Sequence, residues 1–246
     1  MSRGRRVSAA VLTAAAFVVC GFCISASPGR AADEDYARYL LFSGSDSARN
    51  GIFAHGGLLV APDWLDQDGV NLKLVLSGGQ YRYNSGSLGG EPVIGAETRV
   101  TAMPGWRVKR GDLEVKVFFG LDAAYNILLP DDPASSQRGR SIGLRAAFEL
   151  WYNPTPMTML AMDGSLSSVA TNQSARLAYG WRVFDAFYVG PETQLFGSDG
   201  YRHLRFGAHV TGFKTDLYEW SAAAGWAGDS DQRSSPYLRL GVLILQ

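Results

Sequence analysis

The chain has 246 residues, with 23 acidic and 23 basic side chains that give no net formal charge. This balance gives no support to binding of nucleic acid or of an anionic membrane surface. Aromatic residues make up 12% of the chain and there are 29 glycines, a composition that favours a β-rich protein with many turns.

The N-terminus has the pattern of a cleaved signal peptide. Residues 1–6 are basic, residues 7–24 are apolar or small, and Gly29-Arg30-Ala31 offers a cleavage site. We therefore expect residues 1–31 to be a signal peptide and residues 32–246 to be one exported domain, with a retained membrane anchor as the alternative. Both cysteines, Cys20 and Cys23, fall in the removed segment. The exported protein then has no disulfide and no thiolate metal site, and we predict no cofactor.

Downstream of this segment the sequence predicts about twelve β-strands, each near the ~9–11 residues that a tilted transmembrane strand needs. No uninterrupted apolar run approaches the ~18 residues of a membrane-spanning helix. The expected strands cover 38–46, 51–61, 70–83, 93–108, 113–126, 141–152, 157–168, 174–183, 187–196, 201–213, 217–228 and 237–245.

The clearest alternation lies in residues 173–213. Leu177 and Trp181 alternate with Arg176 and Arg182, and a turn signal at 197–200 precedes a further alternating segment. A period of two means that one face of each strand meets an apolar environment. That environment is either the core of a soluble sandwich or the lipid around a barrel.

Connections and tryptophans favour the barrel. The joints at 109–112, 153–156, 184–186 and 214–216 are short, whereas 84–92, 129–140 and 229–236 are longer, as in barrels with short periplasmic turns. The segment 62–69 is long for such a turn. Five of the six tryptophans fall at the expected periplasmic end, where indole rings prefer the headgroup boundary: Trp64, Trp106, Trp151, Trp181 and Trp220, with Trp226 at the other end.

The polar parity of the strands predicts a charged lumen. Acids and bases nearly balance there, so we expect paired charges and a narrow or plugged interior rather than a wide pore. The predicted lumen network consists of Glu97, Arg99, Glu114, Lys116, Arg145, Glu149, Arg176, Glu192, Arg205 and His209.

The three histidines, His55, His203 and His209, are candidate metal ligands or general bases. His203 and His209 are six residues apart on one face, roughly 20 Å at ~3.3 Å per residue, which is too far to share a metal. Both have inward parity, whereas a barrel hydrolase acting on lipid would place a His–Ser pair on its outer wall. We expect no catalytic residues and no metal site.

Several segments resemble the cellulose biosynthesis protein BcsS family of alphaproteobacteria. The similar segments are LFSGSDSARNGIFAHGGLLVAP (41–62), LVLSGGQYRYNSG (74–86), PGWRVKRG (104–111), LRAAFELWYNPT (144–155), ARLAYGWRVFDAFYVGPE (175–192), YRHLRFGAHVTGF (201–213) and EWSAAAGWAGDSD (219–231). They cover nearly all of the exported chain in order. The resemblance implies an accessory protein of a bacterial cellulose synthase, without catalytic or binding residues to carry over.

Together these observations predict an all-β fold, a single antiparallel up-and-down outer-membrane β-barrel of about 12 strands. We expect a non-enzymatic protein in the outer membrane of a diderm bacterium that assists cellulose export or surface anchoring. Its expected partners are membrane lipid, cellulose and other cellulose-synthase components, and Tyr81, Tyr83 and Tyr201 near the outer rim are candidate glucan contacts. The alternatives are an outer-membrane lipid or glycan hydrolase and a passive small-solute channel.

Overall fold

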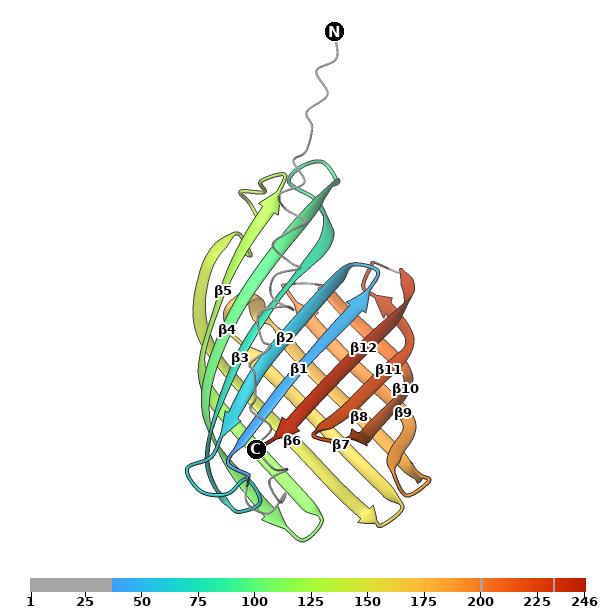
Figure 1. The fold of residues 1–246 in the computed structure, drawn as a ribbon. Helices are drawn as coiled ribbons and strands as arrows, with labels where there is room; N and C mark the ends of the chain where they lie inside the picture. The colour runs from blue at the N-terminus through green and yellow to red at the C-terminus, as the bar shows by residue number, and fades with distance from the viewer. Residues whose placement is uncertain (1–36, 200, 232) are drawn as a thin grey trace.

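A computed structural model describes residues 37–246 of the chain, apart from residues 200 and 232. The predicted signal peptide lies outside the described residues. The described part forms a closed, all-antiparallel barrel in which each strand pairs with its neighbours in sequence and β1 pairs with β12 (Figure 1). Its strands are β1 (Tyr39–Ala48), β2 (Gly51–Val60), β3 (Gly69–Ser85), β4 (Glu91–Arg110), β5 (Leu113–Leu129), β6 (Gly139–Thr155), β7 (Thr158–Ser167), β8 (Gln173–Val183), β9 (Phe187–Ser198), β10 (Tyr201–Thr215), β11 (Tyr218–Asp229) and β12 (Ser234–Leu245).

The twelve-strand barrel fold predicted from the sequence is confirmed. Pairing between the first and the last strand closes the barrel. In this pair Leu40 lies opposite Leu245, and Ser47 lies opposite Leu238. The backbone N–H groups of Arg38 and Tyr39 both donate to the carbonyl of Gln246. Closure leaves no sheet edge, as a β-structure in lipid requires. No helix in the described residues is long and apolar enough to cross a bilayer.

Strand length departs from the prediction on one side of the barrel. Strands β3 to β6 have 17 to 20 residues, so they rise above the rest of the wall at one end, which we call the upper end (Figure 1). The ends of the predicted loops 84–92 and 129–140 are therefore strand, and the connections shrink to 86–90 and 130–138. Turn-forming residues such as Pro92 and Asn84 misled the prediction, because a paired neighbour overrides local preference.

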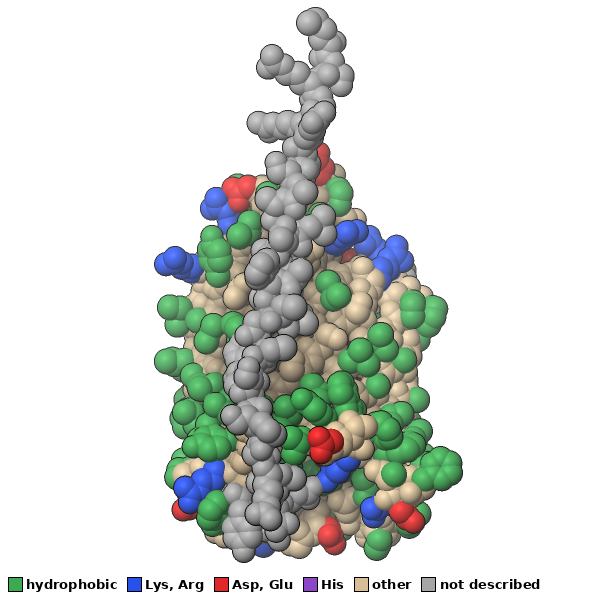
Figure 2. Space-filling model, in the orientation of Figure 1, with side chains coloured by type: hydrophobic (Ala, Val, Ile, Leu, Met, Phe, Trp, Pro, Cys, Tyr) green, Lys and Arg blue, Asp and Glu red, His purple; other side chains and the backbone are tan. Residues whose placement is uncertain are grey.

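The outward face is apolar over the middle of the wall, and most charged side chains gather toward its two ends (Figure 2). This is the arrangement by which an outer-membrane barrel meets lipid. Large outward side chains at least 48% exposed include Val117, Phe119, Leu121, Leu166, Leu195, Phe206 and Leu238. The lower end, opposite the upper one, holds the described start of the barrel and its C-terminus.

The tryptophan prediction is correct for some rings and wrong for one. Trp106, Trp181 and Trp220 are 45–54% exposed on the outward face near the lower end. Trp151 instead shares the inward face with Glu149, two residues before it, and packs edge-on against Tyr188. The prediction used only the position of each tryptophan along the barrel axis. It did not consider that Trp151 has the same parity as Glu149 on β6, which points its ring into the lumen.

Candidate functional site: the lumen and its upper mouth

The lumen is built from inward side chains that the period of two places on every strand. Around its middle, Asp122 on β5 is fully buried and accepts hydrogen bonds from Arg99 and Arg145 at 2.6 and 3.0 Å. Thr101 donates a further bond to the same carboxylate. Arg99 also pairs with Glu97 at 3.0 Å. Several donors per carboxylate offset the cost of removing these charges from water.

A second group of paired charges lies lower in β3, β5 and β6. Lys116 bridges Glu114 at 2.7 Å and Glu149 at 3.4 Å, and Lys73 also pairs with Glu149. Arg107 binds the far side of Glu114 at 2.7 Å. These pairs form a chain of charges across neighbouring strands, with opposite signs adjacent.

A third group joins the opposite wall. Glu192 is 2% exposed and lies 2.5 Å from Arg239 and 3.8 Å from Arg176. Arg205 pairs with Asp46 at 2.5 Å. The structure thus places the ten residues of the predicted network inside the barrel, nine of them in three groups and His209 outside these groups. It adds Asp46 and Asp122 as partners of the predicted arginines.

The histidines all lie on the lumen side. His209 is 1% exposed, and its ring nitrogens lie 2.9 Å from the Thr211 hydroxyl and 3.1 Å from the Tyr179 carbonyl. His203 stacks against Phe196 with ring centroids 5.0 Å apart. His55 packs beside Phe42. Within the described residues, no group of three or more His, Cys, Asp or Glu side chains is arranged to hold a metal ion.

The lower end of the lumen is filled by apolar side chains. One buried cluster joins Leu59 and Phe118 to Leu65, which the unusually long segment 61–68 folds inward. A second joins Met159 and Ala178 on β7 and β8. The first cluster accounts for the length of the 61–68 connection, because this connection supplies part of the floor.

A cavity of about 880 Å³ occupies the upper half of the lumen and reaches down to Glu149 and Arg176. Its walls carry two aromatic groups. On β2 and β3, Phe53 stacks against Tyr81, and Tyr81 against Tyr83, with centroids 6.5 and 6.2 Å apart and interplanar angles of 10° and 22°. On β9 and β10, His203 contacts both Phe196 and Tyr201. We call these rings the aromatic mouth.

Polar groups hold the tyrosines of the aromatic mouth in place. Tyr81 donates to Asn126 and Tyr83 donates to Asp132, each at 3.0 Å. The hydroxyl of Tyr201 lies 3.4 Å from Asp229 and accepts a bond from Asn50. All three candidate tyrosines therefore line the cavity with fixed hydroxyls rather than lying in the lipid boundary. Sequence reasoning missed Phe53, although it shares the parity of His55 two residues further along β2.

The segment 130–138 roofs part of the cavity. Asp132 accepts hydrogen bonds from Tyr83 and Ser87, which attach the segment to the tall wall formed by the long strands β3 to β6. At the other end of the segment, Ser136 donates to Asp199 at 2.6 Å. Hydrogen bonds from Ser85 and Ser87 hold the pKa of Asp132 below its usual value. Asp132 thus remains a carboxylate at neutral pH and fastens the segment beside the mouth.

The whole chain was compared with known proteins. A family model described as cellulose biosynthesis protein BcsS matches residues 40–246. No curated protein sequence matches the chain. Among solved structures, an outer-membrane channel from Pseudomonas putida F1 is 12% identical over 89% of this chain and 99% of its own, with a TM-score of 0.58. The translocator domain of the autotransporter NalP from Neisseria meningitidis is 14% identical over 95% and 97%, with a TM-score of 0.52. At these identities the likeness concerns the fold alone.

Proposed function

The chain belongs to the cellulose biosynthesis protein BcsS family, and from that premise we propose that it is a non-enzymatic accessory protein of bacterial cellulose biosynthesis. In this proposal the barrel lies in the outer membrane with its upper end facing outward. The aromatic mouth binds the glucan chain and so assists its export or holds it at the cell surface.

The observation that carries the proposal is the aromatic mouth itself. Flat rings with fixed orientation offer stacking surfaces to the apolar faces of pyranose rings, and neighbouring polar groups offer hydrogen bonds to the hydroxyls. Tyr81, Tyr83 and Tyr201 combine both features around a cavity whose volume suits an oligosaccharide. Some charges of the same cavity are already paired, as with Arg99 and Glu97, so these groups offer no surplus charge to a ligand.

The proposed orientation rests on the lengths of the connections. The lower end has both described chain ends and, apart from 61–68, only turns of two or three residues, which is the arrangement at the periplasmic side of outer-membrane barrels. The longest upper connection, 130–138, then faces outward beside the mouth.

A hydrolytic function is less well supported. The three histidine rings face the lumen, where His209 contacts Thr211 and a backbone carbonyl and His203 packs on aromatic rings. A barrel enzyme acting on lipid needs its base on the outer wall, within hydrogen-bond reach of the nucleophile. The proposal therefore assigns binding rather than chemistry to these residues.

Deletion in the native host tests the proposal. We expect cell-associated cellulose to fall without loss of glucan synthesis in isolated membranes, and the wild-type gene to restore it. A chain with Tyr81→Ala, Tyr83→Ala and Tyr201→Ala should reach the outer-membrane fraction yet fail to restore cellulose retention. Full restoration by this triple variant would reject the role of the mouth, and unchanged cellulose in the deletion strain would reject the accessory function.

A further inference from the structure

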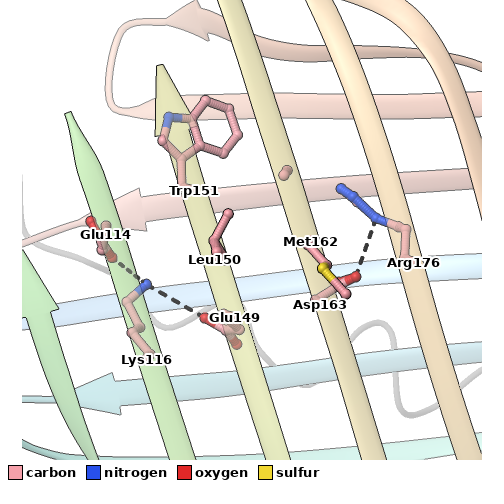
Figure 3. A pocket seen from close by; sticks show the side chains of 9 residues that line it. Glu114, Lys116, Glu149, Leu150, Trp151, Met162, Asp163 and Arg176 are labelled. Carbon is pink, nitrogen blue, oxygen red and sulfur yellow. Dashed lines mark hydrogen bonds and ion pairs between the residues drawn. The ribbon is translucent and has the colours of Figure 1, made fainter. Parts of the chain in front are cut away.

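A second cavity lies lower in the lumen, between β5, β6, β7 and β8. Its volume is about 190 Å³, enough for on the order of ten water molecules and thus for one sugar ring rather than an oligosaccharide. Glu114, Lys116, Glu149, Trp151, Asp163 and Arg176 line it (Figure 3). Three of these side chains, Glu149, Asp163 and Arg176, also line the upper cavity, so the two spaces adjoin at these residues.

Trp151 is the one tryptophan of the barrel strands that faces this interior. Its ring is fixed by an edge-on contact with Tyr188, with centroids 6.1 Å apart, and its indole N–H donates to Asn153 at 2.7 Å. Asn153 is itself fixed by a bond to the Tyr188 hydroxyl at 3.0 Å. An indole whose N–H is satisfied and whose edge is held presents a rigid apolar surface at low entropic cost.

Arg176 is loosely held beside the same cavity. It lies 3.5 Å from Asp163 and 3.8 Å from Glu192, but its Nε and Nη1 atoms have no hydrogen-bond partner among the described residues although both are buried. A buried guanidinium N–H without an acceptor is costly, so a ligand hydroxyl that accepts from it would stabilise the complex.

The charges of the lining restrict the class of ligand. Three carboxylates, those of Glu114, Glu149 and Asp163, face two cations, Lys116 and Arg176 (Figure 3). Arg107 and Lys73 pair with Glu114 and Glu149 from beside the lining, so the charges around the cavity nearly balance. This balance gives a phosphate or uronate group no net attraction. Carboxylates that accept and cations that donate suit the hydroxyls of a neutral sugar, while an aromatic ring suits the apolar face of a pyranose.

We propose that this lower cavity is a second sugar site, which takes one pyranose ring of a neutral glucan against Trp151 with Arg176 as hydrogen-bond donor. The identity of the ligand rests on the proposed function, but the site is distinct from the aromatic mouth. The barrel then holds glucan in two adjoining spaces that meet at Glu149, Asp163 and Arg176.

The test titrates the folded full-length barrel in detergent with cellobiose and with cellohexaose by calorimetry, using digalacturonate as the charged probe. We expect Trp151→Ala and Arg176→Gln each to weaken cellobiose binding at least about tenfold, the effect of losing one good contact. Trp151→Phe should recover part of it, because the aromatic surface remains. Trp181→Ala removes an outward indole at the same end and should leave binding unchanged.

Folding of each variant is checked by the heat-dependent gel mobility of the barrel. If Trp151→Ala fails to fold, the Arg176→Gln variant still tests the site. Cellobiose affinities in folded Trp151→Ala or Arg176→Gln equal to wild type would overturn the second site, as would equal binding of digalacturonate. A folded variant with Tyr81→Ala and Tyr83→Ala separates the two proposals. If it keeps full cellohexaose affinity while Trp151→Ala loses cellobiose, the mouth is wrong and the lower site stands.

Discussion

The ring of Tyr81 lies directly over Gly95 of the neighbouring strand, so that a Cβ added to Gly95 would come within 2.3 Å of the Tyr81 Cζ atom. Phe53 covers Gly79 in the same way, with the built Cβ 2.4 Å from its Cδ1 atom. Because Gly95 and Gly79 have no side chain, the rings of Tyr81 and Phe53 can lie flat over the backbone of the neighbouring strand. The orientation of the aromatic mouth depends on these two glycines.

Gly95→Ala should displace Tyr81 without opening the barrel. We expect affinity for cello-oligosaccharides to fall about tenfold, since the Tyr81 ring and its bond to Asn126 are both disturbed. Calorimetric titration of the folded protein measures this. The control is Gly228→Ala, because a Cβ there meets nothing within 4 Å. Equal losses in the two variants would show that the effect does not arise from Tyr81.

Asp122→Asn should destabilise the barrel by about 3 kcal/mol, because it removes the charge that balances Arg99 and Arg145 inside the lumen. Urea unfolding in lipid vesicles, followed by tryptophan fluorescence, measures the change in the free energy of unfolding. Asp185→Asn changes an exposed turn carboxylate and should have an effect within about 0.5 kcal/mol. A similar small effect at Asp122 would mean that the lumen is hydrated enough to screen its arginines.

Segment 130–138 should stay attached to the barrel wall at neutral pH and should detach only in acid. Because hydrogen bonds from Ser85 and Ser87 lower the pKa of Asp132 in the folded protein, the stabilisation is fully present above the ordinary aspartate pKa. It is lost as pH falls through the lowered folded-state value. The protection of residues 130–138, which is the exchange rate of the unfolded chain relative to theirs at the same pH, should therefore stay high from pH 7 to about 4 and fall below that. Asp132→Asn should give fast exchange at every pH, whereas loss of protection already near pH 6 would contradict the assignment.

Planar bilayers should record no steady stepwise conductance from the purified protein. The buried clusters around Phe118 and Met159 narrow the lower lumen. Near them, Glu149 pairs with Lys116 and Arg176 pairs with Asp163. A close-packed apolar floor leaves no path for hydrated ions. Regular conductance steps, comparable with those of a porin measured in parallel, would favour the passive-channel alternative.

The sequence predicts the strand number and the inward charges because both follow from a period of two that lipid on one side enforces. Arg176, Glu192 and Arg205 could be assigned to the lumen on parity alone. Their partners could not, because the pairing of Arg205 with Asp46 joins positions 159 residues apart. Such a contact depends on closure of the barrel and on strand register.

The long strands β3 to β6 and the inward Trp151 show where local sequence preference fails as a guide. Residues 84–92 contain turn-forming types, yet Asn84 lies opposite Pro92 in a continuing ladder. For Trp151, composition favours the membrane boundary, and only its parity with Glu149 indicates the lumen. Local preference was outweighed in both cases by pairing with neighbouring strands.

The most direct test of the account is retention on cellulose. The folded barrel is passed over insoluble cellulose in detergent, beside a variant with Tyr81→Ala, Tyr83→Ala and Tyr201→Ala. A Tyr125→Ala variant serves as the control, because that ring is 48% exposed on the outward face of the same tall wall. We predict that wild type and the Tyr125 variant bind and that the triple variant passes through. Equal retention of all three proteins would contradict the account.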